Sequence, residues 1–186
     1  MRCTLPRSRY LIPLARPLNP PAQMIAIQAT IRSWLSDLEK PSWRYVFKAT
    51  PIAFFPAMSL ALVLSSFGIY RLEVRADYLG WIFGDALLSP WIETAFMVPV
   101  FWFLRKIRVR NDWLPIASAF VWATRHSIYS PWWGLIVFWP FYVFSRCFLG
   151  HEGISQNRAF IATSVLHTFY NIMAVLLQLG VGNILL

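Results

Sequence analysis

Long apolar stretches alternate with short segments rich in arginine and lysine along most of the chain. The first stretch, residues 51–70, has no charged side chain and has about the 20 residues that one bilayer crossing requires. The second contains only two charged side chains, Asp85 and Glu93. Five such stretches are expected crossings: 51–70, 80–104, 113–129, 131–149 and 159–179. The pattern predicts an all-α fold, a polytopic membrane helical bundle of about five transmembrane helices.

The N-terminal segment, residues 1–48, has a different character and holds eight of the 17 basic residues. Residues 5–21 contain five prolines and no apolar run of signal-peptide length, so we expect no cleaved secretory signal and a partly disordered segment. From Met24 the apolar residues are spaced as on one face of a helix, which predicts an amphipathic helix on the cytoplasmic leaflet. We hypothesise that translation begins at Met24 rather than Met1. The expected organisation is this basic segment followed by a transmembrane domain over residues 49–186.

Composition and charge support a membrane location. Of all residues, 58% are hydrophobic and only 13% are charged, whereas soluble domains have roughly 25% charged residues. The net charge of +9 arises between the apolar stretches, so it indicates topology rather than nucleic-acid binding. With the N-terminus cytoplasmic, 14 basic residues lie inside and three outside. We therefore expect an integral protein of the bacterial inner membrane that contacts membrane lipids and no nucleic acid.

Four of the polar side chains within the expected crossings draw attention as candidate site residues: Glu93, His126, His167 and Asn171. A charged group at the centre of a membrane helix costs about 2.5–3.5 kcal/mol on insertion scales, so such residues often mark functional sites. His167 and Asn171 are four residues apart and share one helical face. The residues one turn after Glu93 are apolar, so we expect its carboxylate to find its partners on other helices, with His126 and His167 as donors.

These residue types can form a general-base site. Glu93 could take a proton from water, His126 and His167 could hold that water, and Asn171 could donate to the oxyanion of a scissile carbonyl. The alternative is a divalent metal such as zinc, bound by Glu93, His126 and His167, because two histidines and one glutamate form a known catalytic zinc set. The sequence leaves both open.

The motifs resemble those of the CPBP family, intramembrane endopeptidases that include CAAX proteases and bacteriocin-processing enzymes. That family carries Glu-Glu-xxx-Arg, Phe-xxx-His and His-xxx-Asn on successive helices. Here His167 to Asn171 matches the third motif, and Trp122 to His126 matches the second with Trp in place of Phe. The resemblance covers about residues 80–179. It implies a metalloprotease-like hydrolase with Glu93 as the catalytic glutamate and a membrane-associated peptide or protein as substrate.

The first motif departs from the family pattern, because Thr94 replaces the second Glu and Val98 replaces the Arg. This departure keeps a second hypothesis open, a non-catalytic membrane scaffold or immunity-type protein that retains the fold. A proton pathway through the membrane is a third hypothesis. The sequence motifs of rhomboid, site-2 and presenilin-type proteases are absent. We expect His151 to lie solvated in a polar loop.

Overall fold

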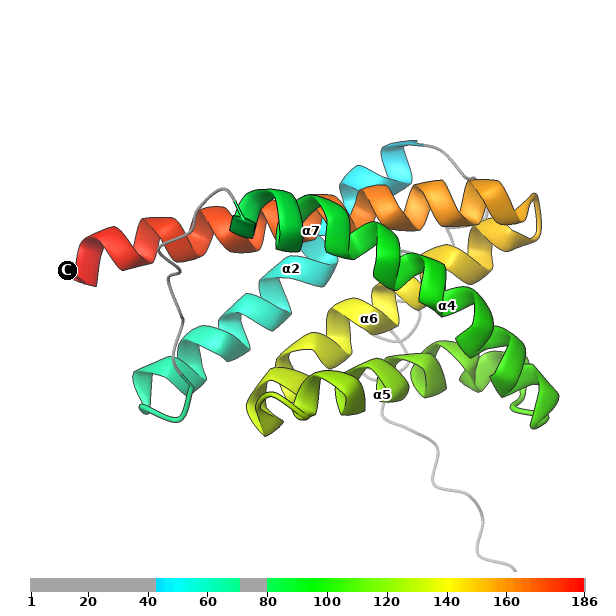
Figure 1. The fold of residues 1–186 in the computed structure, drawn as a ribbon, viewed down its shortest axis with the longest axis horizontal. Helices are drawn as coiled ribbons and strands as arrows, with labels where there is room; N and C mark the ends of the chain where they lie inside the picture. The colour runs from blue at the N-terminus through cyan, green and yellow to red at the C-terminus, as the bar shows by residue number, and fades with distance from the viewer. Residues whose placement is uncertain (1–42, 71–79, 186) are drawn as a thin grey trace, which may run out of the picture. The chain divides into compact units, whose positions relative to one another are not determined.

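The computed structural model describes residues 43–70 and 80–185, with side chains described through residue 180. The predicted amphipathic helix, the alternative start at Met24 and most of the basic N-terminal segment lie outside these residues. Within them, every regular element is helical, which confirms the predicted all-α fold. The elements are α2 (Trp43–Ser66), η2 (Trp81–Leu88), α4 (Ser89–Lys106), η3 (Asn111–Trp113), α5 (Leu114–Ser127), α6 (Pro131–Glu152) and α7 (Gln156–Leu185) (Figure 1).

Four helical segments in the described part are long and apolar enough to cross a membrane: α2, the continuous η2–α4 segment, α6 and α7. Large apolar side chains remain exposed along them, as at Phe55, Trp102 and Leu176. A soluble protein rarely exposes so many apolar side chains, whereas lipid tails cover them without cost. The chain is therefore an integral membrane protein.

The remaining expected crossing, residues 113–129, corresponds to η3 and α5, and α5 has only 14 residues. At 1.5 Å per residue it extends about 21 Å, less than the ~30 Å hydrocarbon core. His126 lies in the last turn of this short helix. Because α7 begins at Gln156, three residues before its predicted start, His167 lies deeper along that helix than the sequence indicated. These two differences bring the histidines to one level.

Helices α5 and α6 form an antiparallel hairpin joined by residues 128–130, and they lie side by side in Figure 1. Their contact includes a buried hydrogen bond of 3.0 Å from the Ser145 hydroxyl to Ser118 Oγ. Near the turn, Gly134 packs so closely on α5 that a Cβ there would lie 2.5 Å from the Ala123 carbonyl oxygen. The hairpin geometry therefore requires glycine at this position.

A proline inside α2 creates a polar link to α6. Pro56 has no N–H, so the carbonyl of Ile52, four residues earlier, has no donor in its own helix. The indole Nε1–H of Trp139 donates to that carbonyl at 2.7 Å. A backbone group in lipid has no water to bond, so this contact both satisfies Ile52 and fixes α2 against α6.

The C-terminal ends of α4 and α6 are joined by a bidentate ion pair between the Arg105 guanidinium and the Glu152 carboxylate, with one N–O distance of 2.9 Å. Helices α4 and α6 consequently run in the same direction. Helix α5, which lies between them in the sequence, is antiparallel to α6. Helix α7 returns across α4, α6 and α2 and carries His167 into the space between them.

We predict that Gly134→Ala destabilises the protein. The added methyl carbon would lie 1.8 Å from Ser127 Oγ and 2.5 Å from the Ala123 carbonyl, so the hairpin must open or shift. Overpacking of this kind costs about 1–3 kcal/mol. Thermal unfolding in detergent should show a lower Tm. Gly180→Ala is the matched control, because that helical glycine has nothing within 4 Å, and equal Tm changes in both variants would contradict the prediction.

Candidate active site

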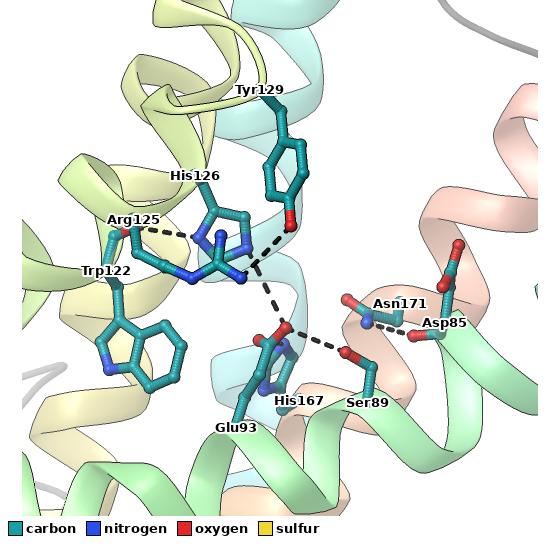
Figure 2. A network of polar contacts seen from close by, with 9 residues as sticks. All are labelled: Asp85, Ser89, Glu93, Trp122, Arg125, His126, Tyr129, His167 and Asn171. Atoms are coloured by element: carbon teal, nitrogen blue, oxygen red, sulfur yellow. Dashed lines mark hydrogen bonds and ion pairs between the residues drawn. The ribbon is translucent and has the colours of Figure 1, made fainter.

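Glu93 lies on α4, facing imidazoles from two other helices (Figure 2). Its Oε2 is 3.5 Å from Nε2 of His167 on α7, and its Oε1 is 3.9 Å from Nε2 of His126 on α5. The side chains of Glu93 and His126 are 22% and 16% exposed, and that of His167 is 4% exposed. The structure thus brings three of the four predicted site residues together.

Glu93 also has a partner on its own helix, contrary to the prediction that it had none. The Ser89 hydroxyl, one turn earlier, donates to Glu93 Oε1 at 2.9 Å. The i, i+4 spacing of Ser89 and Glu93 is visible in the sequence, whereas the prediction rested on the apolar residues one turn after Glu93. Ser89 therefore fixes the rotamer of the carboxylate between the two imidazoles.

The orientation of His126 is set within the last turn of α5. Its Nδ1 lies 2.9 Å from the Trp122 carbonyl oxygen, an acceptor, so Nδ1 carries the proton and donates. In the neutral ring, Nε2 is then an acceptor that faces Glu93 Oε1. Two acceptors 3.9 Å apart are best joined by a molecule that donates to both, and water has the two hydrogens this requires.

His167 is held in an aromatic cage. Its ring stacks on Phe144 at a centroid distance of 4.3 Å and meets the edge of Phe141 at 5.4 Å. Phe141 also contacts the ring of His126 at 5.3 Å, so one α6 side chain positions both imidazoles. His167 Nδ1 is buried without a hydrogen-bond partner in the described part of the chain, which favours the tautomer with its proton on Nε2, facing Glu93.

The second motif supplies the wall beside His126. The Trp122 ring is nearly parallel to Phe141, with 4.8 Å between centroids, and lies 6.1 Å from the His126 ring. Arg125 donates to the Tyr129 hydroxyl at 3.2 Å (Figure 2), and its positive charge is close enough to interact with the Glu93 carboxylate. Arg125 was not singled out from the sequence, although it directly precedes His126.

The Asn171 amide bonds the backbone of η2 and not Glu93. Its Nδ2 donates to the backbone carbonyl of Asp85 at 2.7 Å, linking α7 to the π-helix η2 (Figure 2). The Ser89 N–H donates to the Gly84 carbonyl, five residues earlier, which is the π-helical pattern. By the same pattern, the donor expected for the Asp85 carbonyl is the N–H of residue 90. That residue is Pro90, which has no N–H. Asn171 therefore supplies the donor that the proline removes, and one hydrogen of its amide remains.

The two departures from the first motif lie in different environments. Thr94, at the position of the second Glu, is fully buried, and its hydroxyl has no hydrogen-bond partner in the described residues. Val98, at the position of the Arg, is 37% exposed. A charged side chain at residue 94 would therefore be buried, and one at residue 98 would face the outside of the bundle.

The arrangement of the donor atoms bears on whether the site can hold a metal ion. Over residues 43–70 and 80–180, no group of three His, Cys, Asp or Glu side chains is arranged to hold a metal ion. Glu93, His126 and His167 nevertheless offer the donor atoms that zinc prefers. Zinc binding by this set stays a prediction.

The prediction that His151 lies solvated in a polar loop is wrong. It lies within the last turn of α6 and is only 2% exposed, because α6 continues to Glu152 and packs against α2. Its Nδ1–H donates to the Cys147 carbonyl at 2.8 Å. Cys147 is likewise buried.

Comparisons of the chain with the models of known protein families, with curated proteins and with solved structures find no match. The CPBP resemblance therefore rests on the motif residues alone.

We predict that Asn171→Ala lowers the stability of the protein by about 1–3 kcal/mol, because the part-buried Asp85 carbonyl loses the donor that Asn171 supplies. Thermal unfolding in detergent would measure the loss. Asn111→Ala, at an exposed position, is the control and should leave Tm nearly unchanged. A wild-type Tm in Asn171→Ala would show that the Asn171–Asp85 bond contributes nothing.

Proposed function

We propose that this protein is an intramembrane endopeptidase that hydrolyses a peptide bond in a membrane-associated peptide or protein through water activated by Glu93. The observation that carries the proposal is the convergence of Glu93, His126 and His167 from three helices, within 3.5 and 3.9 Å. The order of the three motifs along the chain, and their likeness to CPBP proteases, adds to it. The proposed location is the bacterial inner membrane, with the N-terminus cytoplasmic.

In the proposed reaction, water between Glu93 and His126 donates one hydrogen to each, which turns its oxygen lone pairs toward the substrate carbonyl. Glu93 takes the proton as the oxygen adds to the carbonyl carbon, forming a tetrahedral oxyanion. The remaining amide hydrogen of Asn171 is the proposed donor to that oxyanion. Glu93 then gives the proton to the departing amine as the C–N bond breaks, which restores the carboxylate.

The other side chains have positioning roles in this scheme. Ser89 holds one carboxylate oxygen by its hydrogen bond, and the Nε2–H of His167 faces the other at 3.5 Å, so that the basic lone pair faces the water rather than the helix. Phe141 fixes both imidazole rings. The partial exposure of Glu93, 22%, leaves a route for water and substrate to the carboxylate.

We expect Glu93→Gln to reduce peptide cleavage at least 10²-fold, because the amide cannot accept the proton and general-base catalysis contributes about 10²–10⁴. Purified protein in detergent would be assayed against membrane-anchored peptides, with cleavage followed by mass spectrometry. Glu152→Gln is the matched control, since that carboxylate pairs with Arg105 away from the site. Cleavage that survives Glu93→Gln would remove Glu93 as the base.

The same assay distinguishes the roles of water and metal. A metal-independent site should retain its activity after dialysis against 1,10-phenanthroline, because Glu93 itself takes the proton. Loss of activity that only added Zn²⁺ restores would instead assign the three side chains as zinc ligands.

A non-catalytic scaffold or immunity role is the alternative, and the buried Thr94 in place of the second Glu favours it. Under this alternative the polar cluster is structural. Glu93→Gln would then preserve the biological function of the protein, and the wild type would cleave no membrane peptide.

A further inference from the structure

The Glu93 site lies at different distances from the two ends of the bundle. The basic end carries the Arg105–Glu152 ion pair, and the turn end carries residues 128–130, which join α5 to α6. Along α4, Glu93 is 12 residues from Arg105, which is about 18 Å at 1.5 Å per residue. His126 adjoins the turn end, because it is the last but one residue of α5. The shorter way from the site to the outside is therefore through the turn end.

Aromatic rings close the site on the side of the basic end. Phe101 on α4 and Phe148 on α6 stack at a centroid distance of 5.3 Å, between the site and that end. Phe144, one turn closer to the site than Phe148, stacks on the His167 ring, so the aromatic layer is continuous up to the imidazole. All three phenylalanines are fully buried, and so is Met97, one turn closer to the site than Phe101. Close-packed interiors leave few voids that admit water, so this layer excludes water from the basic end.

The side chains between the site and the turn end are more open. Glu93 and His126 are partly exposed, and Ser89, one turn before Glu93, is half-buried. Trp133, in the first turn of α6, is 39% exposed, and its ring lies 6.4 Å from that of His126. Tyr129, in the turn itself, is 72% exposed. Exposed tyrosine and tryptophan side chains are typical of the boundary between lipid and water, so this boundary lies close to the site at the turn end.

We propose that water and substrate reach Glu93 from the turn end alone, and that the substrate is a membrane-anchored peptide whose scissile bond lies just beneath the membrane surface on that side. With the proposed cytoplasmic N-terminus, this is the outer side of the membrane. A scissile bond at the level of the basic end would be separated from the carboxylate by the aromatic layer. The substrate part of this proposal rests on the proposed function, whereas the access route does not.

The access route is tested by labelling introduced cysteines with a charged, membrane-impermeant thiol reagent in sealed membrane vesicles of each orientation. The parent is full-length Cys3→Ser, whose remaining Cys147 is buried and provides the blank. Tyr129→Cys and Arg110→Cys, at exposed positions, report the turn end and the loop beside the basic end. Glu93→Cys should react about tenfold faster or more in the orientation that labels Tyr129→Cys, because a thiolate forms readily only where water reaches the thiol.

Ser89→Cys is the second probe, because it leaves the Glu93 carboxylate in place. It should be labelled from the same side as Glu93→Cys, and thermal unfolding would show that both variants fold. Labelling from the Arg110 side, or no labelling of either folded variant, would overturn the access route. Labelling from the Arg110 side would instead assign the water route to the buried hydroxyls of Thr163 and Ser164, which have no hydrogen-bond partner in the described residues.

The substrate part is tested with two single-span peptides that carry the same scissile sequence, one just beneath the surface at the turn end and the other beneath the opposite surface. The wild type should cleave the first peptide and leave the second intact, as mapped by mass spectrometry. Equal cleavage of both peptides would overturn the substrate assignment. Cleavage of neither, with labelling from the Tyr129 side, would overturn the proposed function and its substrate while supporting the access route.

Discussion

The hydrocarbon core of a bilayer contains no water to bond exposed polar groups, and this constraint governs how the helices are joined. Two prolines each leave a carbonyl without its helical donor. The Ile52 carbonyl, freed by Pro56, receives the Trp139 indole, and the Asp85 carbonyl, next to Pro90, receives the Asn171 amide. In both cases the replacement donor comes from another helix, so the defect in one helix becomes a specific contact between two.

The same constraint applies with more force to Glu93, because a carboxylate costs more to bury than a carbonyl. Its surroundings provide a hydroxyl from its own helix, two imidazoles and a nearby arginine. These groups come from α4, α5 and α7, whereas α6 contributes Phe141, which fixes the rings. The close approach of α5 to α6 at Gly134 therefore matters to the site as well as to the fold, since it places Phe141 against His126.

The sequence predicted the class of fold and the meeting of three polar residues, because both depend on features that lie within single helices. Runs of apolar residues define the crossings, and isolated ionisable groups within them must turn inward. It did not predict that α5 is short or that α6 extends to Glu152, because residues around 128–131 and 150–156 are compatible with either helix or turn. The sequence predicted that Asn171 shares a helical face with His167. Its bond to Asp85 depends on the π-helical register of η2, which no sequence pattern indicates.

The altered first motif can be understood from the same geometry. Under the proposed function, a base between two imidazoles needs one group to set its rotamer and one positive charge to stabilise its carboxylate after the proton leaves. Ser89, one turn before Glu93, does the first. Arg125 lies near enough to do the second, from α5 rather than from α4. The positions at which the CPBP pattern carries its second Glu and its Arg are here a buried threonine and an outward-facing valine, and neither could serve these needs. On the proposed function, Ser89 and Arg125 therefore support the base from positions other than those at which the CPBP pattern carries its second Glu and its Arg.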